Sequence, residues 1–462
     1  MSPQSYTVLQ WVLVVGSSVA LFLVSPLARD GSAFFRGARR ERAPGALALM
    51  SSLVISWLFA KSITNAANLG LSYGLIGGVA SAAYYASFAV AGVVIYFLRT
   101  RGGYNSIHEF LRSRFGRGAV LLFSLLIAFR LFNEVWSNTM VIGSYFGNAG
   151  SAPYYGAILV FTGLTLAYSL KGGMSSSILT DVIQMVLFGV LLTVVLGAMY
   201  AYLGYAVPPA GTSGAVAGGY SGGHVLLLVA LLQSLSYPFH DPVLTDRGFL
   251  AAPKTSLRAF LWAVPVGAAS IVLFSLVGVF GRSVGVAGQA PVEVARLLGG
   301  PVLLVMNFIM ITSAASTLDS TFSSFAKLAV VDLAPGRREL PRVSAGRWAM
   351  VGITLLGTLP VFLNPAILSA TTVSGAMVVG LAPVFCLWWL PVPRAGFFLS
   401  VLAGLAFGTV YVLGVWPAWL VYGTLPYADL LSVTVCSLLV CTLLYLSPLL
   451  VRRADPAAHS RP

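Results

Sequence analysis

Residues 301–331 read PVLLVMNFIMITSAASTLDSTFSSFAKLAVV, an apolar stretch long enough to cross a membrane, with polar residues near its centre. The polar residues lie in the segment Ser316-Thr317-Leu318-Asp319-Ser320. Hydrocarbon cannot solvate hydroxyls and a carboxylate, so these groups must face a protein interior or a water-filled path. The stretch therefore predicts a membrane helix that carries a functional site at mid-depth.

The whole chain has the composition of a membrane protein. It is 58% hydrophobic and only 9% charged, whereas soluble domains average about 25% charged residues. No polar stretch is long enough to fold separately, so we expect one membrane domain over residues 1–462. The net charge of +14 is explained by basic residues on cytoplasmic loops, and we expect no nucleic-acid partner.

The apolar runs predict an all-α fold with thirteen membrane-spanning helices. Their expected ranges are 8–28, 45–74, 76–98, 118–147, 153–170, 174–203, 223–241, 257–281, 301–331, 345–363, 367–391, 396–415 and 429–450.

The basic residues predict the orientation of these spans. With the N-terminus outside, the external loops contain only Arg282 and Arg296, and the other loop cations lie inside. We therefore expect an external N-terminus, an uncleaved first helix over 8–28, and a short cytoplasmic tail over 451–462. The short external loops favour a plasma membrane, the inner membrane of a bacterium.

One span contains a clear breaking signal. Span 223–241 carries Ser234-Leu235-Ser236-Tyr237-Pro238, and Pro242 follows. Proline removes a backbone donor and frees nearby carbonyls. Span 45–74 has polar residues at its centre but no central Pro or Gly, so the sequence does not predict a break there. Interrupted helices at matching positions of two halves are typical of inverted-repeat transporters.

The hydroxyls of Ser316 and Thr317 admit two interpretations. They can bind sodium, a hard cation that prefers oxygen ligands, if a second, partly unwound helix supplies carbonyl groups. They can instead bond back to the carbonyl one turn earlier in their own helix. Spacing alone leaves both open.

Ionisable groups inside the spans should each have a partner. Arg130 and Glu134 are four residues apart and can pair on one helix face. Lys61 is also within possible reach of Glu134, as a structural pair or as a titrating group in proton coupling. Lys327 lies near a helix end, where its side chain can extend to the membrane surface.

Amides and aromatic rings in three spans suggest a site for a polar solute. The candidate solute-binding residues are Trp57, Lys61, Asn65, Asn68, Asn133, Glu134, Gln233, Ser234 and Tyr237. The sequence has no HExxH, GxSxG, Walker A or CxxC motif, so it does not indicate an enzyme or an ATP-driven pump.

Four landmarks, in order along the chain, resemble the sodium/solute symporter family. Residues 34–40 resemble the family's loop before the second span, and 171–184 its glycine pair followed by a TD-x-x-Q segment. Residues 246–254 resemble its arginine-bearing Ala-Ala-x-Lys loop, and 313–320 its sodium-site helix. The resemblance covers the chain from about residue 34 to 390.

The resemblance implies the five-plus-five inverted-repeat fold of leucine-transporter type. The repeats would be 45–203 and 223–391, with 8–28 before them and 396–450 after them. It also implies a sodium site between the second and ninth spans, with sodium as the co-transported ion. The residues that match its ligands are the hydroxyls of Ser316 and Thr317 and the backbone carbonyls of Ser313, Ile55 and Leu58. Asp181 and Asp319 would have coupling or structural roles.

The predicted function is sodium-coupled import of a small polar organic solute across a lipid bilayer by alternating access. Lys61 is not a general feature of the family, so a proton-coupled carrier of the same fold, using Lys61 or Glu134, is the alternative. A membrane sensor or scaffold without transport is less favoured. The sequence does not give the oligomeric state.

Overall fold

The fold is all-helical in the part of the chain that the structure, a computed structural model, describes. That part comprises residues 3–37, 43–204, 221–333, 342–363 and 375–454, and it contains no β-strand. The N-terminal half contains α1 (Pro3–Val24), α2 (Gly31–Arg36), α3 (Ala46–Trp57), α4 (Ala60–Tyr73), α5 (Leu75–Ala83), α6 (Ala86–Thr100), α7 (Ile107–Phe115), α8 (Arg117–Gly143), α9 (Ala152–Gly172) and α10 (Met174–Tyr202). The prediction of an all-α chain is confirmed.

The C-terminal half begins with short helices and ends with long ones. It contains α11 (Gly222–Gln233), η1 (Tyr237–His240), α12 (Pro242–Arg247), α13 (Pro253–Ser283), α14 (Ala290–Leu297), α15 (Gly300–Lys327), η2 (Leu328–Asp332), α16 (Val343–Thr358), η3 (Leu359–Leu363), α18 (Leu381–Cys386), α19 (Arg394–Val412), η4 (Ala418–Leu420) and α20 (Ala428–Ala454).

The chain is a multi-pass membrane protein. Among the described residues, ten helices are long and apolar enough to span a membrane. The pair α3 and α4, bent by 62°, makes an eleventh if it is one span. The predicted span 223–241 is α11 followed by a break, and the predicted span 367–391 lies partly outside the described residues. The count of thirteen and the repeat boundaries therefore stay predictions.

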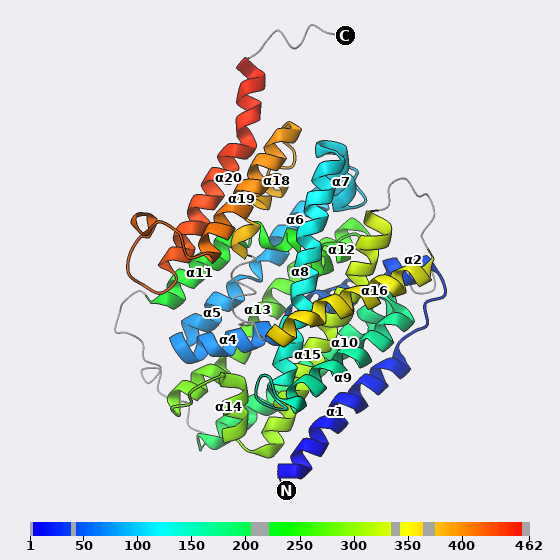
Figure 1. Cartoon of the computed structure of the whole chain (residues 1–462), viewed down its shortest axis with the longest axis vertical. Helices are drawn as coiled ribbons and strands as arrows, with labels where there is room; N and C mark the ends of the chain where they lie inside the picture. Colours follow the sequence, from blue (N-terminus) through cyan, green and yellow to red (C-terminus); the bar gives the residue numbers. More distant parts are fainter. Residues whose placement is uncertain (1–2, 38–42, 205–220, 334–341, 364–374, 455–462) are drawn as a thin grey trace.

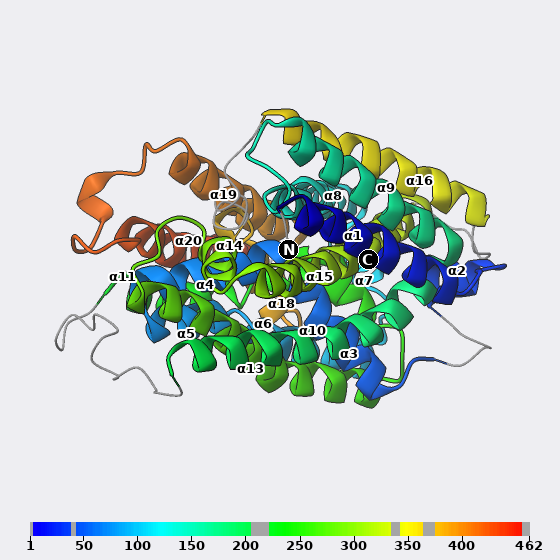
Figure 2. The ribbon, with the colours of Figure 1, turned by 90° about the horizontal axis from the view of Figure 1, so that it is seen from below.

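Helix α15 lies at the centre of the bundle, as two perpendicular views show (Figures 1 and 2). It contacts α8, α9, α10 and α16 along its length. It is also the most buried of the described span-length helices, whereas α1 is the least buried of them. The polar segment 316–320 is thus surrounded by protein on all sides.

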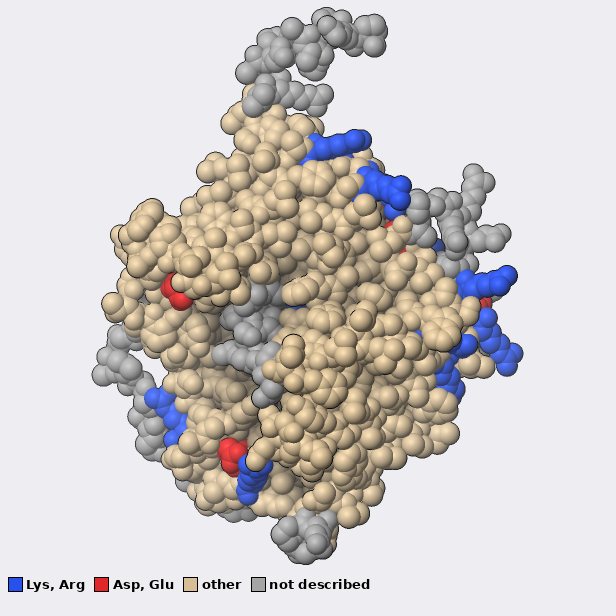
Figure 3. Space-filling model, viewed as in Figure 1, with Lys and Arg blue, Asp and Glu red and all other residues tan. Residues whose placement is uncertain are grey.

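The outer surface has the character expected of a membrane protein. Figure 3 shows one face that is nearly free of charge, with Lys and Arg gathered mainly along its upper and right-hand margins. Large apolar side chains are exposed on many helices, for example Leu125, Val186 and Leu443. Such a surface is stable only against lipid or another apolar partner.

Two of the four sequence landmarks meet at one contact. Gly173 has a φ of +55° and ends α9 in the tight turn before α10. A Cβ at this position would lie 2.5 Å from the backbone oxygen of Phe34 in α2. The glycine is therefore required both by the turn conformation and by the close approach of α2.

Helices α4 and α13 approach each other through glycines. A Cβ at Gly278 would lie 1.7 Å from the backbone oxygen of Ala67, and one at Gly70 would lie 2.3 Å from that of Ser275. Small residues of this kind let helix backbones touch in a membrane bundle. Because α4 is half of the bent pair, this contact fixes the position of one side of the bend.

We predict that Gly278→Ala lowers the free energy of unfolding by about 1–3 kcal/mol, because even one methyl group forces the two helices apart. Thermal unfolding of the purified protein in detergent measures this. The control is Gly189→Ala in α10, where a Cβ meets nothing within 4 Å. Equal melting temperatures for the two variants would contradict this account of the contact.

Candidate functional site

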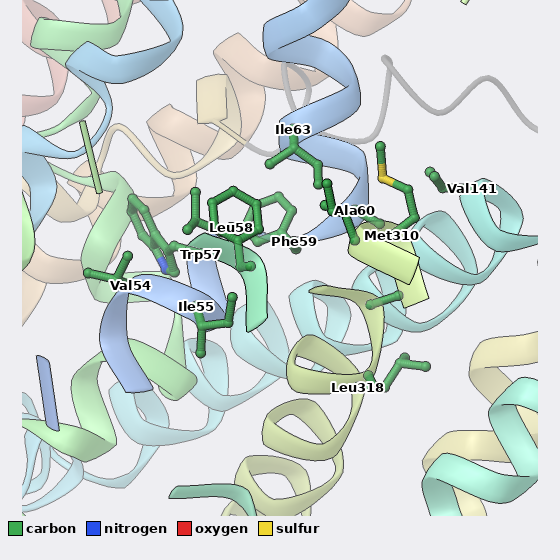
Figure 4. Close-up of a cluster of buried hydrophobic side chains, with 14 of the residues drawn as sticks. Val54, Ile55, Trp57, Leu58, Phe59, Ala60, Ile63, Val141, Met310 and Leu318 are labelled. Atoms are coloured by element: carbon green, nitrogen blue, oxygen red, sulfur yellow. The ribbon is translucent and has the colours of Figure 1, made fainter. Parts of the chain in front are cut away.

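The first helix break separates α3 from α4 at Leu58 and Phe59. Polar side chains satisfy the backbone there. Ser62 Oγ donates to the carbonyls of Trp57 and Phe59, both at 2.9 Å. The backbone N–H of Lys61 donates to Asn138 Oδ1 of α8 at 3.2 Å. Figure 4 shows the apolar side chains that surround the break, including Leu318 of α15.

The second break follows α11, where the sequence predicted one. The chain continues through η1 and restarts as α12 after Asp241. Asp241 Oδ1 accepts from the backbone N–H groups of Val243 (3.0 Å) and Leu244 (3.4 Å), which makes it the N-cap of α12. Both interrupted helices thus end and restart next to buried polar groups.

A buried network of four charges joins the two breaks, and we call Lys61, Arg130, Glu134 and Asp241 the break network. Lys61 Nζ lies 2.9 Å from Glu134 Oε1, and Arg130 Nη1 lies 3.0 Å from the same oxygen. Arg130 Nη2 lies 3.0 Å from Asp241 Oδ2. Two cations and two carboxylates balance, as buried charges must.

The break network confirms the expected pairing of Arg130 with Glu134 and brings Lys61 to the same carboxylate. Lys61 is fully buried and also donates to Ser137 Oγ at 3.1 Å. Lys327 has two acidic partners at the end of α15. Its ammonium group pairs with Asp246 at 2.5 Å and with Asp332 at 3.1 Å, because these two carboxylates lie beside the end of α15.

A second buried polar group surrounds Asp181 of α10. Asp181 accepts from Ser52 Oγ of α3 and from Ser316 Oγ of α15, each at 2.5 Å. The guanidinium of Arg247, from α12, donates to Asp181 Oδ2 at 3.0 Å and to Ser320 Oγ at 2.8 Å. One carboxylate thus ties four helices together inside the bundle.

Asp319 lies in the same group but has no cationic partner. Its Oδ2 accepts from Thr180 Oγ1 at 2.8 Å, and its Oδ1 accepts from Ser320 Oγ at 3.3 Å. In the described part of the chain, no Lys, Arg or His lies within ion-pair distance of it. We call Asp181, Arg247, Ser316, Asp319 and Ser320 the Asp181 cluster. It contains two carboxylates and one permanent cation, so charge balance requires one further positive charge.

The residues matched to sodium ligands lie on both sides of the contact between α3 and α15. Ser56 Oγ and Ser320 Oγ lie 3.2 Å apart and join the two helices directly. The hydroxyl of Thr317 donates to the backbone oxygen of Ser313 at 3.0 Å, which is the second interpretation given above. The hydroxyl of Ser316 instead points to Asp181.

Three of the candidate solute-binding residues line one small cavity. Trp57, Asn65 and Tyr237 are among its lining residues, and its volume is about 100 Å³. Lys61 and Glu134 lie in the break network beside it. This cavity is the best match to the predicted solute site.

Three other candidates have structural partners elsewhere. Asn68 Oδ1 accepts from the backbone N–H of Ala290 at 2.9 Å, outside the cavity. Ser234 Oγ donates to the carbonyl of Leu231 in its own helix. Gln233 donates to Thr434 and accepts from Tyr84, which ties α11 to α20 and to the turn between α5 and α6. Asn133 is buried in α8 and does not line the cavity.

Sequence reasoning missed Asp241, Tyr84 and Tyr85. Tyr84 and Tyr85 line the cavity, and Asp241 accepts a hydrogen bond from Trp57 Nε1 at 2.9 Å. A signal for Asp241 was present, because an aspartate before a proline just after a helix break has the form of an N-cap. The two tyrosines gave no signal that separates a lining residue from a packing residue.

A much larger cavity, of about 870 Å³, opens at the other end of α12. Its lining includes His108 and the charged residues Arg99, Arg112, Asp246, Lys327 and Asp332. Asp246 is adjacent in sequence to Arg247, so the wall of this cavity borders the Asp181 cluster. The predicted orientation places this cavity on the cytoplasmic side of the membrane.

Two interrupted helices that meet beside buried charges within an apolar bundle define a membrane transporter fold. Residues 35–207 match the sequence model of the sodium:solute symporter family. This match includes the landmarks at 34–40 and 171–184, apart from Phe34, and confirms the resemblance over that part of the chain. The matching family and the structural neighbours below are transporters and not enzymes.

Solved structures share the fold over nearly the whole chain. A Na+-coupled sialic acid symporter in a substrate-bound outward-open state has a TM-score of 0.66 at 15% identity, covering 96% of this chain and 98% of the other. Mhp1, a nucleobase-cation-symport-1 family transporter, has a TM-score of 0.57 at 14% identity in a closed conformation, covering 93% and 96%. Its inward-facing conformation has a TM-score of 0.53 at 15% identity, covering 95% and 99%. No curated protein matches the sequence.

We predict that Lys61→Met destabilises the protein by on the order of 3 kcal/mol, because it removes one charge from a balanced buried network. Lys61→Met/Glu134→Gln should recover most of that loss. Thermal unfolding in detergent measures both changes, and Lys254→Met, at an exposed lysine, is the control. A double variant no more stable than the single one would show that Lys61 and Glu134 do not act as a pair.

Proposed function

We propose that this protein is a secondary active transporter that couples the import of a small polar organic solute to sodium. The observation that carries the proposal is the unbalanced carboxylate of the Asp181 cluster. A fully buried Asp319 without a cationic partner, surrounded by hydroxyl groups, needs a bound cation or a proton. Sodium prefers an all-oxygen environment of this kind.

Two further observations support sodium as that cation. The family matched by residues 35–207 is the sodium:solute symporter family. The structural neighbour described as a Na+-coupled sialic acid symporter has the same fold. Within this chain the cation site would take the hydroxyls of Ser316 and Thr317 and the carbonyls of Ser313, Ile55 and Leu58, with Asp181 and Asp319 setting its charge.

Alternating access is supported by the position of this site between α3, which is half of an interrupted helix, and the continuous helix α15. A cation shared by α3 and α15 stabilises the state in which those helices are closest, and its release favours the other state. The 870 Å³ cavity beside Asp246 would then be the exit to the cytoplasm in a plasma membrane. The five-plus-five repeat over 45–203 and 223–391 supplies the two units that move.

A proton-coupled carrier of the same fold is the second candidate. The unpaired carboxylate of Asp319 favours it, because a proton balances the charge as well as sodium does. Lys61 and Glu134, named for this role from the sequence, pair with each other at 2.9 Å and have no charge to balance. Uptake driven by a pH gradient in sodium-free buffer would support this candidate over sodium coupling.

The test is thermal stability of the detergent-purified protein, titrated with NaCl against matched KCl and choline chloride. A ligand that binds only the folded state raises the melting temperature by mass action. We predict a sodium-specific rise that is lost in Ser316→Ala/Thr317→Ala and in Asp319→Asn.

Ser324→Ala is the matched control, because Ser324 is a buried serine of the same helix outside the proposed site. It should retain the sodium shift. A wild-type protein that responds equally to the three salts would contradict the sodium proposal, as would an unchanged sodium shift in Asp319→Asn.

A further inference from the structure

Helix α12 joins the break network to the Asp181 cluster. Its N-cap, Asp241, pairs with Arg130 of α8 at 3.0 Å. Its last residue, Arg247, pairs with Asp181 of α10 at 3.0 Å. Both ion pairs are buried, so breaking either one leaves a charge without compensation inside the bundle. This short helix is therefore fixed at each end by an ion pair to a different long helix.

The carboxylate of Asp241 uses both of its oxygens. Oδ2 accepts from Arg130 Nη2 at 3.0 Å and from Trp57 Nε1 at 2.9 Å. Oδ1 accepts from the backbone N–H groups of Val243 and Leu244. Trp57 is the last residue of α3 and lines the small aromatic cavity. One side chain therefore joins α3, α8 and the start of α12. An asparagine cannot replace it, because its amide nitrogen only donates.

Arg247 holds the other end of α12 in the Asp181 cluster. Its side chain is fully buried and donates to Asp181 Oδ2 at 3.0 Å, to Ser320 Oγ at 2.8 Å and to Ser52 Oγ at 2.5 Å. It is the permanent cation of that cluster, in which Asp319 has the unbalanced carboxylate. Because the interaction between charges falls with distance, the place of the guanidinium sets how strongly the two carboxylates attract a further cation.

Contacts inside α12 let a shift at one end reach the other. The helix has six residues, a length of about 9 Å. Thr245 Oγ1 donates to the backbone oxygen of Asp241 at 3.1 Å. Arg247 Nη1 donates to the backbone oxygen of Val243 at 2.6 Å. Pro242, the first residue, has a fixed φ that favours this helix start. With its side chains tied to its own backbone, α12 moves as one piece.

We propose that Asp241 is a positioning residue for cation binding. By holding the start of α12, it fixes the place of Arg247 and so sets the sodium affinity of the Asp181 cluster, to which it does not belong. Because Trp57 of the small aromatic cavity donates to the same carboxylate, Asp241 also links that cavity physically to the cation site. Such coupling acts equally in both directions. This inference rests on the proposed sodium coupling and names a residue through which the coupling acts.

Loss of the Asp241 charge should weaken sodium binding. Asp246 ties the C-terminal end of α12 to Lys327 of α15 at 2.5 Å, so a helix released at its N-terminus would turn about that end. Arg247 is next to Asp246 in sequence and would then be free to move toward Asp319, the carboxylate that lacks a cation. There the guanidinium would compete with sodium for the same negative charge.

The test is equilibrium binding of radioactive sodium to the purified full-length protein at constant ionic strength. Asp241→Asn should raise the dissociation constant for sodium about fivefold or more, a change typical of coupling between sites. Asp30→Asn is the matched control, because Asp30 caps α2, another six-residue helix, from an exposed position. It should leave the dissociation constant unchanged. A purely structural role for Asp241 would lower the melting temperature without changing the sodium affinity.

Two further measurements keep the test open if Asp241→Asn does not fold well. Trp57→Phe keeps an aromatic ring and removes one donor to Asp241, so it should weaken sodium binding by a smaller factor. Melting temperatures in choline chloride of Asp241→Asn, Ser320→Ala and the double variant test the link without sodium. Because Ser320 accepts from Arg247, the double variant should lose less than the sum of the two single losses.

Two results would overturn the inference while leaving sodium coupling intact. One is an unchanged sodium affinity in Asp241→Asn, or in Trp57→Phe where Asp241→Asn does not fold. The other is an additive loss of stability in the double variant, which would show that α12 does not link its two ends. A wild-type protein without saturable sodium binding would instead overturn the proposed function, and with it the role of Asp241 in cation binding.

Discussion

The structure depends on the placement of Asp181 and Arg247, an ion pair at 3.0 Å with neither side chain exposed. A charge in the interior of a membrane bundle is tolerated only when partners surround it. Those partners come from α3, α10, α12 and α15, so these four helices cannot separate without exposing a charge. Asp319 enters the same group without a cation of its own. The group that holds the four helices together is therefore also the group that lacks one positive charge.

The break network, unlike the Asp181 cluster, has equal numbers of positive and negative charges. Lys61, Arg130, Glu134 and Asp241 balance each other, and no further ion is needed there. These residues hold the ends of two interrupted helices in fixed positions and keep free charge out of the neighbouring aromatic cavity. The molecule thus separates two tasks. The Asp181 cluster lacks one positive charge, which we propose a cation supplies, and the break network is balanced without any ion.

The helical class, most of the spans and the polar segment of α15 were predictable from the sequence, because hydrophobic runs and their interruptions are local signals. The sequence could not show which distant residues pair with one another. Arg247 and Ser316 lie 66 and 135 residues from Asp181 along the chain, and only tertiary structure brings them together. The break at Leu58 could not be predicted either, since no Pro or Gly marks it. The hydrogen bond that Asn138 of another helix accepts from the backbone N–H of Lys61 there is also not evident from the sequence. The pairing of Lys327 with Asp246 was also not predictable, because Asp246 is 81 residues away along the chain.

The most direct test of the account is equilibrium binding of radioactive sodium to the purified protein, compared between wild type and Asp319→Asn. Because charge balance calls for one positive charge beside Asp319, we predict saturable sodium binding that potassium does not displace and that Asp319→Asn abolishes. Undiminished sodium binding in that variant, or no saturable binding in the wild type, would contradict it.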